Sequence, residues 1–200
     1  MSGDVTAVVL VGGRSSRMGI DKALIVPIGA GGRTLTELVL DALAVEADYT
    51  LLAGRALPEL DVPAIPDRYF DAGPLGGITS ALAEVDTPLA LVAACDMPAI
   101  VPALLRLLLA RARAEPQAAA VMCATGAGLE PLLSAWRPAL ALPGLRAAVA
   151  TGVYSLRDAV GRLPLALVLP PEEWRGADPE GASFRNWNTP EDLPTTTTQL

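Results

Sequence analysis

Residues 5–22 read VTAVVLVGGRSSRMGIDK, and this stretch decides the expected fold. Its first seven residues form a short, nearly continuous run of apolar and β-branched side chains, which is typical of a strand buried on both faces. A loop with three glycines, two arginines and one lysine follows directly. Because a strand buried on both faces needs helices on each side of its sheet, Val5–Val11 predicts an α/β fold.

Strand and helix patterns alternate along the rest of the chain. The capping-box pair Thr34 and Glu37 marks the start of one helix, and Pro102 suits the first turn of a helix that reaches about Arg113. The other expected helices cover 76–85, 138–150 and 155–160, and the other expected strands cover 49–53, 62–65, 89–94, 118–123, 132–136 and 165–169. This alternation predicts three layers: a mostly parallel central sheet with helices on both faces.

The length of the chain fits one domain. We expect residues 1–193 to form it, and we expect the polar, unpatterned residues 194–200 to be a disordered tail. Ligands of such parallel sheets bind beyond the carboxyl ends of the strands. The segments 12–22, 67–77 and 95–98 each follow a predicted strand, so we expect the functional site where they meet.

Composition excludes several classes of function. The chain has 200 residues and no histidine, which removes the usual serine and cysteine triads and most zinc sites. Its net charge of −7 makes nucleic acid and anionic membranes unexpected partners. Cys95 and Cys123 lie in apolar stretches and are expected to be reduced thiols of a cytoplasmic protein. We see no leader peptide and no apolar run of the ~20 residues that would span a bilayer.

Lys22 is the only lysine, whereas the other fourteen basic residues are arginines. An ammonium group is a compact point charge on a thin stem, and it can reach one phosphate oxygen in a narrow loop where a guanidinium cannot. This lysine therefore indicates an anion site. Chance survival of one lysine on a solvated surface is the alternative.

The loop Gly12–Lys22 is suited to phosphate. Its glycines let backbone N–H groups turn toward an anion, and Arg14, Arg17 and Lys22 would neutralise a polyphosphate. It matches neither the dinucleotide fingerprint nor the P-loop. An ordinary turn between a strand and a helix, with exposed arginines, remains the alternative for this loop taken alone.

Two further segments carry suggestive side chains. The segment Asp67–Gly77 is turn-rich, with closely spaced glycines before a helix, and would allow a flat ligand to approach closely; a plain connection is the alternative.

In Ala93–Pro98 a strand ends at Asp96, a natural place for a magnesium ligand, because Mg²⁺ takes one or two carboxylates and completes its shell with phosphate and water. A helix-capping aspartate is the alternative there, and we expect Cys95 to pack rather than react.

The last segment with chemistry is Phe184–Leu193. Alternation would place the amides of Asn186 and Asn188 on one side of a short strand, and Thr189-Pro190 would then begin a helix. Taken alone, this segment is mostly a structural signature.

The run Leu10-Val11-Gly12-Gly13, continued through Arg17-Met18-Gly19 to Asp21-Lys22, resembles the signature loop of molybdenum cofactor guanylyltransferases. Valine stands at position 11 where that family usually has alanine. The other three segments resemble further family motifs, in the same order, from about Val5 to Leu193. The resemblance implies a Rossmann-like, three-layer nucleotidyltransferase fold.

The resemblance also implies roles for particular residues. Gly12 and Gly13 would cradle the phosphates, Asp67 with Gly73–Gly77 would contact guanine and ribose, and Asp96 would hold the metal. Some members carry an asparagine near position 53 that touches the nucleotide, and Ala53 cannot supply that amide. Glu130-Pro131-Leu132 resembles a variable segment near the acceptor pocket. The implied catalytic residues are Lys22, Arg17 and Asp96, and the implied binding residues are Leu10, Val11, Gly12, Gly13, Arg14, Lys22, Asp67, Gly73, Pro74, Leu75, Gly76, Gly77, Asp96, Asn186 and Asn188.

The activity implied by the family is transfer of GMP from GTP to the terminal phosphate of molybdopterin, with Mg²⁺ as cofactor and pyrophosphate as the second product. Molybdoenzyme apoproteins are the implied partners. A cytidylyltransferase on the same pterin, a sugar-1-phosphate nucleotidyltransferase and a non-catalytic carrier of nucleotide or molybdopterin remain alternatives. The enzymatic interpretation requires Lys22 and Asp96 to converge on one triphosphate.

Overall fold

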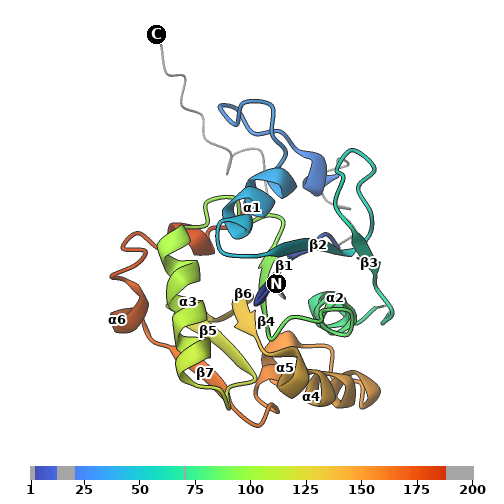
Figure 1. Ribbon diagram of the computed structural model, residues 1–200, viewed down its shortest axis with the longest axis vertical. Coiled ribbons are helices and arrows are strands. Elements are labelled where there is room, and N and C mark those ends of the chain that lie inside the picture. The colour runs from blue at the N-terminus through green and yellow to red at the C-terminus, as the bar shows by residue number, and fades with distance from the viewer. Residues whose placement is uncertain (1–2, 13–20, 70, 188–200) are drawn as a thin grey trace.

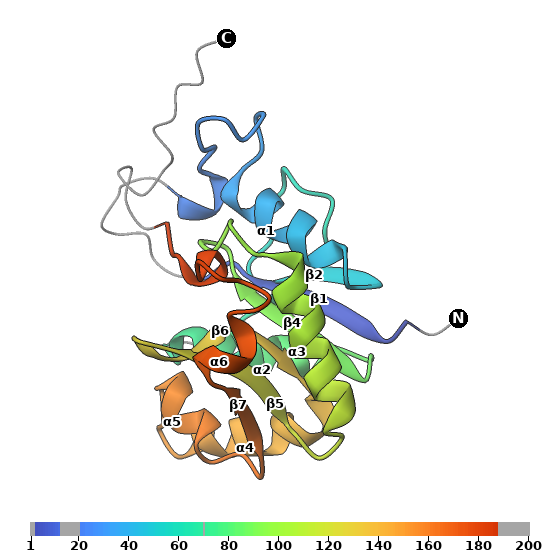
Figure 2. The ribbon, with the colours of Figure 1, turned by 90° about the vertical axis from the view of Figure 1, so that its left-hand side faces the viewer.

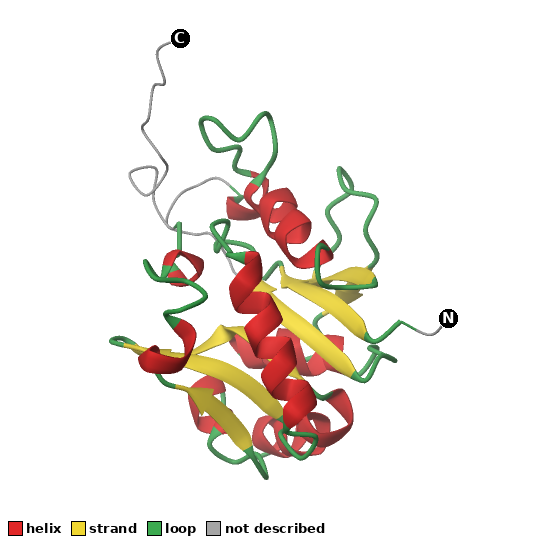
Figure 3. Cartoon of the chain, turned by 60° about the vertical axis from the view of Figure 1, so that its left-hand side comes forward, coloured by secondary structure: helices red, strands yellow, loops and turns green. Residues whose placement is uncertain are grey.

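The computed structural model describes residues 3–12, 21–69 and 71–187. Within them, seven strands form one sheet that lies between helices (Figure 1, Figure 3). The strands are β1 (Val5–Leu10), β2 (Tyr49–Gly54), β3 (Ala64–Pro66), β4 (Leu89–Ala94), β5 (Ala120–Thr125), β6 (Gly128–Trp136) and β7 (Ala166–Leu169). The helices are α1 (Leu35–Ala44), α2 (Gly73–Leu82), α3 (Pro102–Ala114), α4 (Pro138–Ala150), α5 (Leu156–Val160) and α6 (Pro171–Trp174), with short 3₁₀ turns η1 (Lys22–Leu24) and η2 (Ala182–Phe184).

The sheet has the strand order β3-β2-β1-β4-β6-β5-β7. Pairings among β1, β2, β3 and β4 are parallel, and β7 is parallel to β5. Strand β6 runs antiparallel to both of its neighbours. Only two residues separate it from β5, and so short a connection makes those two strands a hairpin. The mostly parallel sheet is confirmed, with β6 as the exception.

Alternate residues of β1 belong to two separate cores, which explains why the whole strand is apolar. Val5, Ala7 and Val9 pack with side chains of α1 and α3, whereas Val8 and Leu10 pack with those of α2, α4 and α5. Figure 2 looks onto the face that carries α3 and α6, with α2, α4 and α5 behind the sheet. The predicted helical layers on both faces are therefore present.

Several predicted elements agree closely with the structure. The bounds of β4 and α4 are those predicted, and Thr34 and Glu37 form the expected capping box at the start of α1. Helix α2 begins and ends three residues earlier than expected, because Pro74 suits its first turn although Gly73-Pro74, with φ of +56° at Gly73, reads as a turn. No helix in the described part of the chain is long and apolar enough to cross a membrane.

The C-terminal segment corrects one prediction. Residues 185–187 are irregular rather than a strand, and one main-chain hydrogen bond fastens them to the sheet region, from Trp187 N–H to Asp96 O at 2.8 Å. The rest of that prediction, namely Asn188, the helix start at Thr189-Pro190 and the tail 194–200, lies outside the described residues.

Candidate active site

Lys22 and Asp96 meet at the carboxyl edge of the sheet. The Lys22 ammonium donates a hydrogen bond to Asp96 Oδ2 across 3.0 Å, although 74 positions separate the two residues in sequence. Their side chains are 23% and 20% exposed, so the pair is accessible from solvent but largely surrounded by protein. The sequence-based requirement that these two groups converge is met.

A short turn aims Lys22 at that point. Asp21 caps η1 by accepting the Ala23 N–H at 3.2 Å, and Lys22 is the first residue of the turn. The buried Thr36 hydroxyl donates to Ala23 O at 2.8 Å, which fastens η1 to the start of α1. The lysine therefore extends from a backbone that is held at both ends.

Asp96 lies just beyond β4. The strand end is fixed to β1 by a hydrogen bond from Cys95 N–H to Leu10 O at 3.2 Å, and Asp96 O accepts the Trp187 N–H. The following helix, α3, has Val101 as its N-cap. Asp96 is thus not the cap of that helix, which removes the structural alternative considered from sequence.

Both cysteines lie where burial disfavours the thiolate. Burial, reinforced by the negative charge of Asp96, raises the pKa of the Cys95 thiol to about 12. Burial likewise raises the pKa of Cys123 to about 12. Both are free, Cys123 is buried and Cys95 packs against the same core, so the prediction that they pack is confirmed.

The ends of β1 and β2 touch each other closely. Val11 N–H donates to Ala53 O at 2.7 Å. A Cβ on Gly54, which has φ of +117°, would lie 2.8 Å from Val11 O, so only glycine allows this approach. Gly12 is exposed, and among the described residues no atom lies within 4 Å of the place its Cβ would occupy. The described part of the chain therefore leaves space beside Gly12.

The start of α2 reaches the same edge. Asp67 Oδ1 accepts the Tyr69 N–H at 2.8 Å and the Ser80 hydroxyl at 3.3 Å, which folds the loop back onto the helix. A Cβ on Gly76 would lie 3.0 Å from this carboxylate, and one on Gly77 would lie 3.7 Å from a Leu10 methyl group. Leu75, Gly76 and Gly77 are buried here, while Gly73 and Pro74 are exposed.

The remaining predicted site residues belong to the glycine-rich segment and to the asparagine-containing segment. Gly13, Arg14, Arg17 and Asn188 lie outside the described residues. Asn186 is exposed and precedes Trp187, whose main chain is bonded to that of Asp96.

Sequence reasoning missed a second ion pair beside the first. Arg55 Nη2 donates to Asp21 Oδ2, and the two side chains are 45% and 37% exposed. Arg55 directly follows β2, so a basic residue just beyond a buried parallel strand was the signal available in the sequence.

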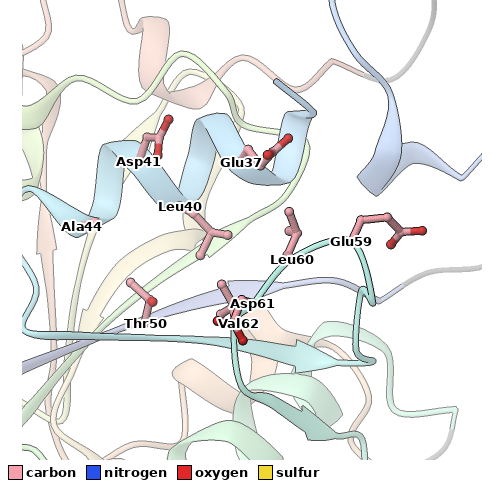
Figure 4. A pocket seen from close by; sticks show the side chains of 9 residues that line it. All are labelled: Glu37, Leu40, Asp41, Ala44, Thr50, Glu59, Leu60, Asp61 and Val62. Carbon is pink, nitrogen blue, oxygen red and sulfur yellow. The ribbon is translucent and has the colours of Figure 1, made fainter. Parts of the chain in front are cut away.

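A hollow of about 370 Å³ lies elsewhere, between α1 and the segment before β3 (Figure 4). None of the residues predicted for the site lines it. Four carboxylates do, and they would repel a triphosphate. Its lining residues are Glu37, Leu40, Asp41, Ala44, Thr50, Glu59, Leu60, Asp61 and Val62.

The doubly wound sheet, with a lysine–aspartate pair and glycine-rich strand ends at its carboxyl edge, defines a class: Rossmann-like α/β proteins built to hold a phosphate-bearing ligand. Within that class, the chain belongs to the family of MobA-like NTP transferase domains, whose model matches residues 7–165. It is therefore a nucleotidyltransferase by family.

Curated relatives cover nearly the whole chain. A probable molybdenum cofactor guanylyltransferase of Chloroflexus aggregans is 37% identical over 94% of this chain and 91% of its own length. A molybdenum cofactor guanylyltransferase of Rhodopseudomonas palustris is 35% identical over 94% of this chain and 88% of its own length.

Solved structures agree on the fold. Molybdopterin-guanine dinucleotide biosynthesis protein A from Archaeoglobus fulgidus is similar with a TM-score of 0.77 and 28% identity, over 94% of each chain. A 2-C-methyl-D-erythritol 4-phosphate cytidylyltransferase from Thermus thermophilus has a TM-score of 0.63 at 18% identity, over 93% of this chain and 94% of its own, a likeness of fold alone.

Proposed function

We propose that this chain transfers GMP from GTP to the terminal phosphate of molybdopterin and releases pyrophosphate. The observation that carries the proposal is the Lys22–Asp96 pair, a cation and a carboxylate 3.0 Å apart at the carboxyl edge of the sheet. The names of relatives that span nearly the whole chain support guanine over cytosine and molybdopterin as the acceptor.

The reaction requires alignment and charge neutralisation rather than a strong base. An oxygen of the acceptor phosphate forms a bond to the α-phosphorus of GTP while the bond from that phosphorus to the β-phosphate oxygen breaks. The acceptor oxygen is already anionic at neutral pH, so the absence of histidine is no obstacle. Lys22 would exchange Asp96 for a phosphate oxygen and stabilise the charge that develops on the leaving pyrophosphate.

Asp96 has the chemistry of a Mg²⁺ ligand. Its carboxylate is one-fifth exposed and already accepts a hydrogen bond from a cationic group. No cluster of three or more carboxylate or thiol ligands occurs among the described residues, which suits Mg²⁺, since that ion takes one or two carboxylates and otherwise phosphate and water. When bound, the ion would supply further neutralisation of phosphate charge.

The remaining binding residues extend the proposal. Arg14 and Arg17 would bind the phosphates together with Gly12 and Gly13. The start of α2, Gly73–Gly77, would receive the guanine and ribose, with Asp67 holding its loop in place. Asn186 and Asn188 would approach the metal and the acceptor.

The proposed setting is the cytoplasm, because both cysteines are free thiols, as expected in a reducing compartment. Molybdoenzyme apoproteins would then be the recipients of the guanine dinucleotide product.

The test is a pyrophosphate-release assay with Mg²⁺ and each common nucleoside triphosphate, with molybdenum-bound molybdopterin present and absent. We expect release with GTP only when the pterin is present, together with formation of the guanine dinucleotide. Release with CTP instead would make the chain a cytidylyltransferase. Binding of GTP with no release would make it a carrier.

A further inference from the structure

Asp21 is held from two directions, immediately before the lysine of the site. Its Oδ1 accepts the Ala23 N–H at 3.2 Å, and its Oδ2 accepts a hydrogen bond from Arg55. Asp21 is adjacent to Lys22 in sequence, so the two ion pairs Arg55–Asp21 and Lys22–Asp96 form one linked group of four charges with no net charge.

Arg55 extends from a rigid base. It follows Gly54, whose backbone lies so close to Val11 that a Cβ would be 2.8 Å from Val11 O. Gly54 O also accepts the Asp67 N–H at 3.3 Å. The guanidinium therefore starts from a point that is fixed relative to β1 and to the loop before α2.

Among the described residues, the main chain of the turn that carries Lys22 is bonded to α1. Thr36 bonds to Ala23 O, and Leu35 N–H bonds to Ile25 O at 2.8 Å, and both donors belong to α1. Arg55 adds an attachment to the sheet side through Asp21, beside the bond that Lys22 itself makes with Asp96. It also neutralises a carboxylate next to Lys22 that would otherwise repel a triphosphate.

We propose that Arg55 is a positioning residue: through Asp21 it fixes the turn that aims Lys22 and cancels the negative charge beside it. The inference rests on the proposed nucleotidyl transfer for its kinetic consequence, but its geometric consequence can be tested independently. Arg55 is thus a determinant of the reaction that acts without touching the reacting atoms.

The kinetic test compares Arg55→Ala, Arg55→Lys, Asp21→Asn and the double variant Arg55→Ala/Asp21→Asn. Asparagine keeps the cap on η1 while removing the charge. Because small displacements of a group that contacts substrate are costly, we expect Arg55→Ala and Asp21→Asn each to lower kcat about tenfold. The double variant should be no slower than either single one, since both remove the same interaction. Arg55→Lys should recover most of the rate.

The matched control is Arg33→Ala. Arg33 pairs with Asp41 of α1 at 2.8 Å, and these side chains are 53% and 58% exposed, so the pair has the same chemistry as Arg55–Asp21 but joins the segment before α1 to that helix. We expect its loss to leave kcat unchanged.

The second readout uses the single lysine and needs no substrate. An amine-acylating reagent followed by peptide mass spectrometry reports the reactivity of Lys22 alone among the side chains. We expect Arg55→Ala and Asp21→Asn to increase the labelling rate of Lys22 severalfold over wild type, because Lys22 is then held less firmly against Asp96. Arg33→Ala should not change it.

The outcomes separate the two proposals. If Arg55→Ala is slow while Asp21→Asn is normal and Lys22 labelling is unchanged, Arg55 contacts the substrate directly and the positioning inference is overturned. Normal kinetics and normal labelling in Arg55→Ala overturn it as well. If wild type forms no guanine dinucleotide, the proposed function fails, whereas the labelling comparison still decides the role of Arg55.

Discussion

The two halves of the sheet differ in the burial and the bonding of their polar side chains. In the half made of β3, β2, β1 and β4, the polar side chains at the carboxyl edge are charged and partly exposed, as in Lys22–Asp96 and Arg55–Asp21. In the half made of β6, β5 and β7, the buried Trp136 indole donates to Ser134 Oγ at 2.7 Å, and that hydroxyl donates to Pro131 O at 2.7 Å. The charged side chains of the first half can exchange their partners for a ligand. The buried polar groups of the second half already have hydrogen-bond partners within the protein.

Strand direction explains this division. The parallel strands β1, β2, β3 and β4 all bring their carboxyl ends to one edge, so residues far apart in sequence meet there. Strand β6 runs the other way, so the residues that follow it emerge at the opposite edge. We therefore expect substitutions of the charged residues at the carboxyl edge of the parallel strands to impair the reaction, and substitutions of the buried polar residues of β6 to impair stability alone.

The largest effect should come from the lysine–aspartate pair. Lys22→Ala and Asp96→Ala should each slow guanylyl transfer by about a hundredfold or more, the range seen when a preorganised electrostatic group is lost. Both side chains are partly exposed, so the free energy of unfolding should change little. Steady-state kinetics and urea denaturation of the same preparations measure the two quantities, with Asp41→Asn as the exposed control. Near-normal transfer by either variant would remove the pair from the mechanism.

Two adjacent glycines of α2 offer a sharper test within the first half. A Cβ at Gly76 would meet Tyr69 O at 2.7 Å and the Asp67 carboxylate at 3.0 Å, whereas the nearest atom to one at Gly77 is 3.7 Å away. Gly76→Ala should thus cost about 1–3 kcal/mol of stability through overpacking, and should raise KM for the nucleotide by displacing the loop.

The neighbouring variant is the control for that prediction. Gly77→Ala adds the same methyl group in the same helix without a clash, so its helix propensity should leave stability unchanged or raise it by up to about 1 kcal/mol. Equal denaturation midpoints for the two variants would mean that Asp67 and Tyr69 do not pack against α2 as described.

Sequence and structure can be compared along the same division. Three elements can be predicted from the sequence: strand β1, the capping box at Thr34 and strand β4. In each of them the local sequence pattern matches the burial or the capping contact found in the structure. The convergence of Lys22 and Asp96 could be expected from parallel strand ends. The start of α2 could not, since Gly73-Pro74 also reads as a turn: Gly73 has φ of +56°, and Pro74 lies in the first helical turn, where proline is favoured.

Other features depend on contacts that no local pattern contains. Arg55 is one arginine among fourteen, and only the fold brings it to Asp21. The sequence at Asn186-Trp187 alternates as in a strand. In the structure the segment is irregular, and one hydrogen bond from Trp187 N–H to Asp96 O joins it to the end of β4 in place of regular strand pairing. The roles of Arg14, Arg17 and Asn188, which lie outside the described residues, stay predictions.

A smaller effect is expected from the second half. Ser134→Ala leaves the buried Trp136 N–H without its acceptor, which should cost about 1–3 kcal/mol in the free energy of unfolding. The rate of guanylyl transfer at a temperature where the variant is folded should equal that of wild type. A loss of rate without a loss of stability would erase the contrast between the two halves.

The smallest effect lies in the first half but away from the charges of the site. Glu37 Oε2 accepts the Thr34 N–H at 2.7 Å and the Thr34 hydroxyl at 2.8 Å, and these hydrogen bonds, the backbone one first, lower the pKa of Glu37 below its ordinary value of 4.5. A carboxyl whose pKa is lowered by folding stabilises the protein above the unfolded pKa, and that contribution disappears as the pH falls through the folded pKa. Thr34→Ala should therefore cost about 1 kcal/mol near neutral pH and progressively less in acid.

The pH dependence distinguishes the cap from general packing. Glu37→Gln keeps the size of the side chain but cannot titrate, so its stability should approach that of wild type as the pH falls below 4.5, while its transfer rate stays that of wild type at neutral pH. Urea denaturation across the acid range measures this convergence. If the gap between Glu37→Gln and wild type stayed constant with pH, the charge of Glu37 would contribute nothing to the cap. If Glu37→Gln slowed transfer, the site would extend along α1, and the separation of reactive from structural polar groups would have to be drawn within the first half.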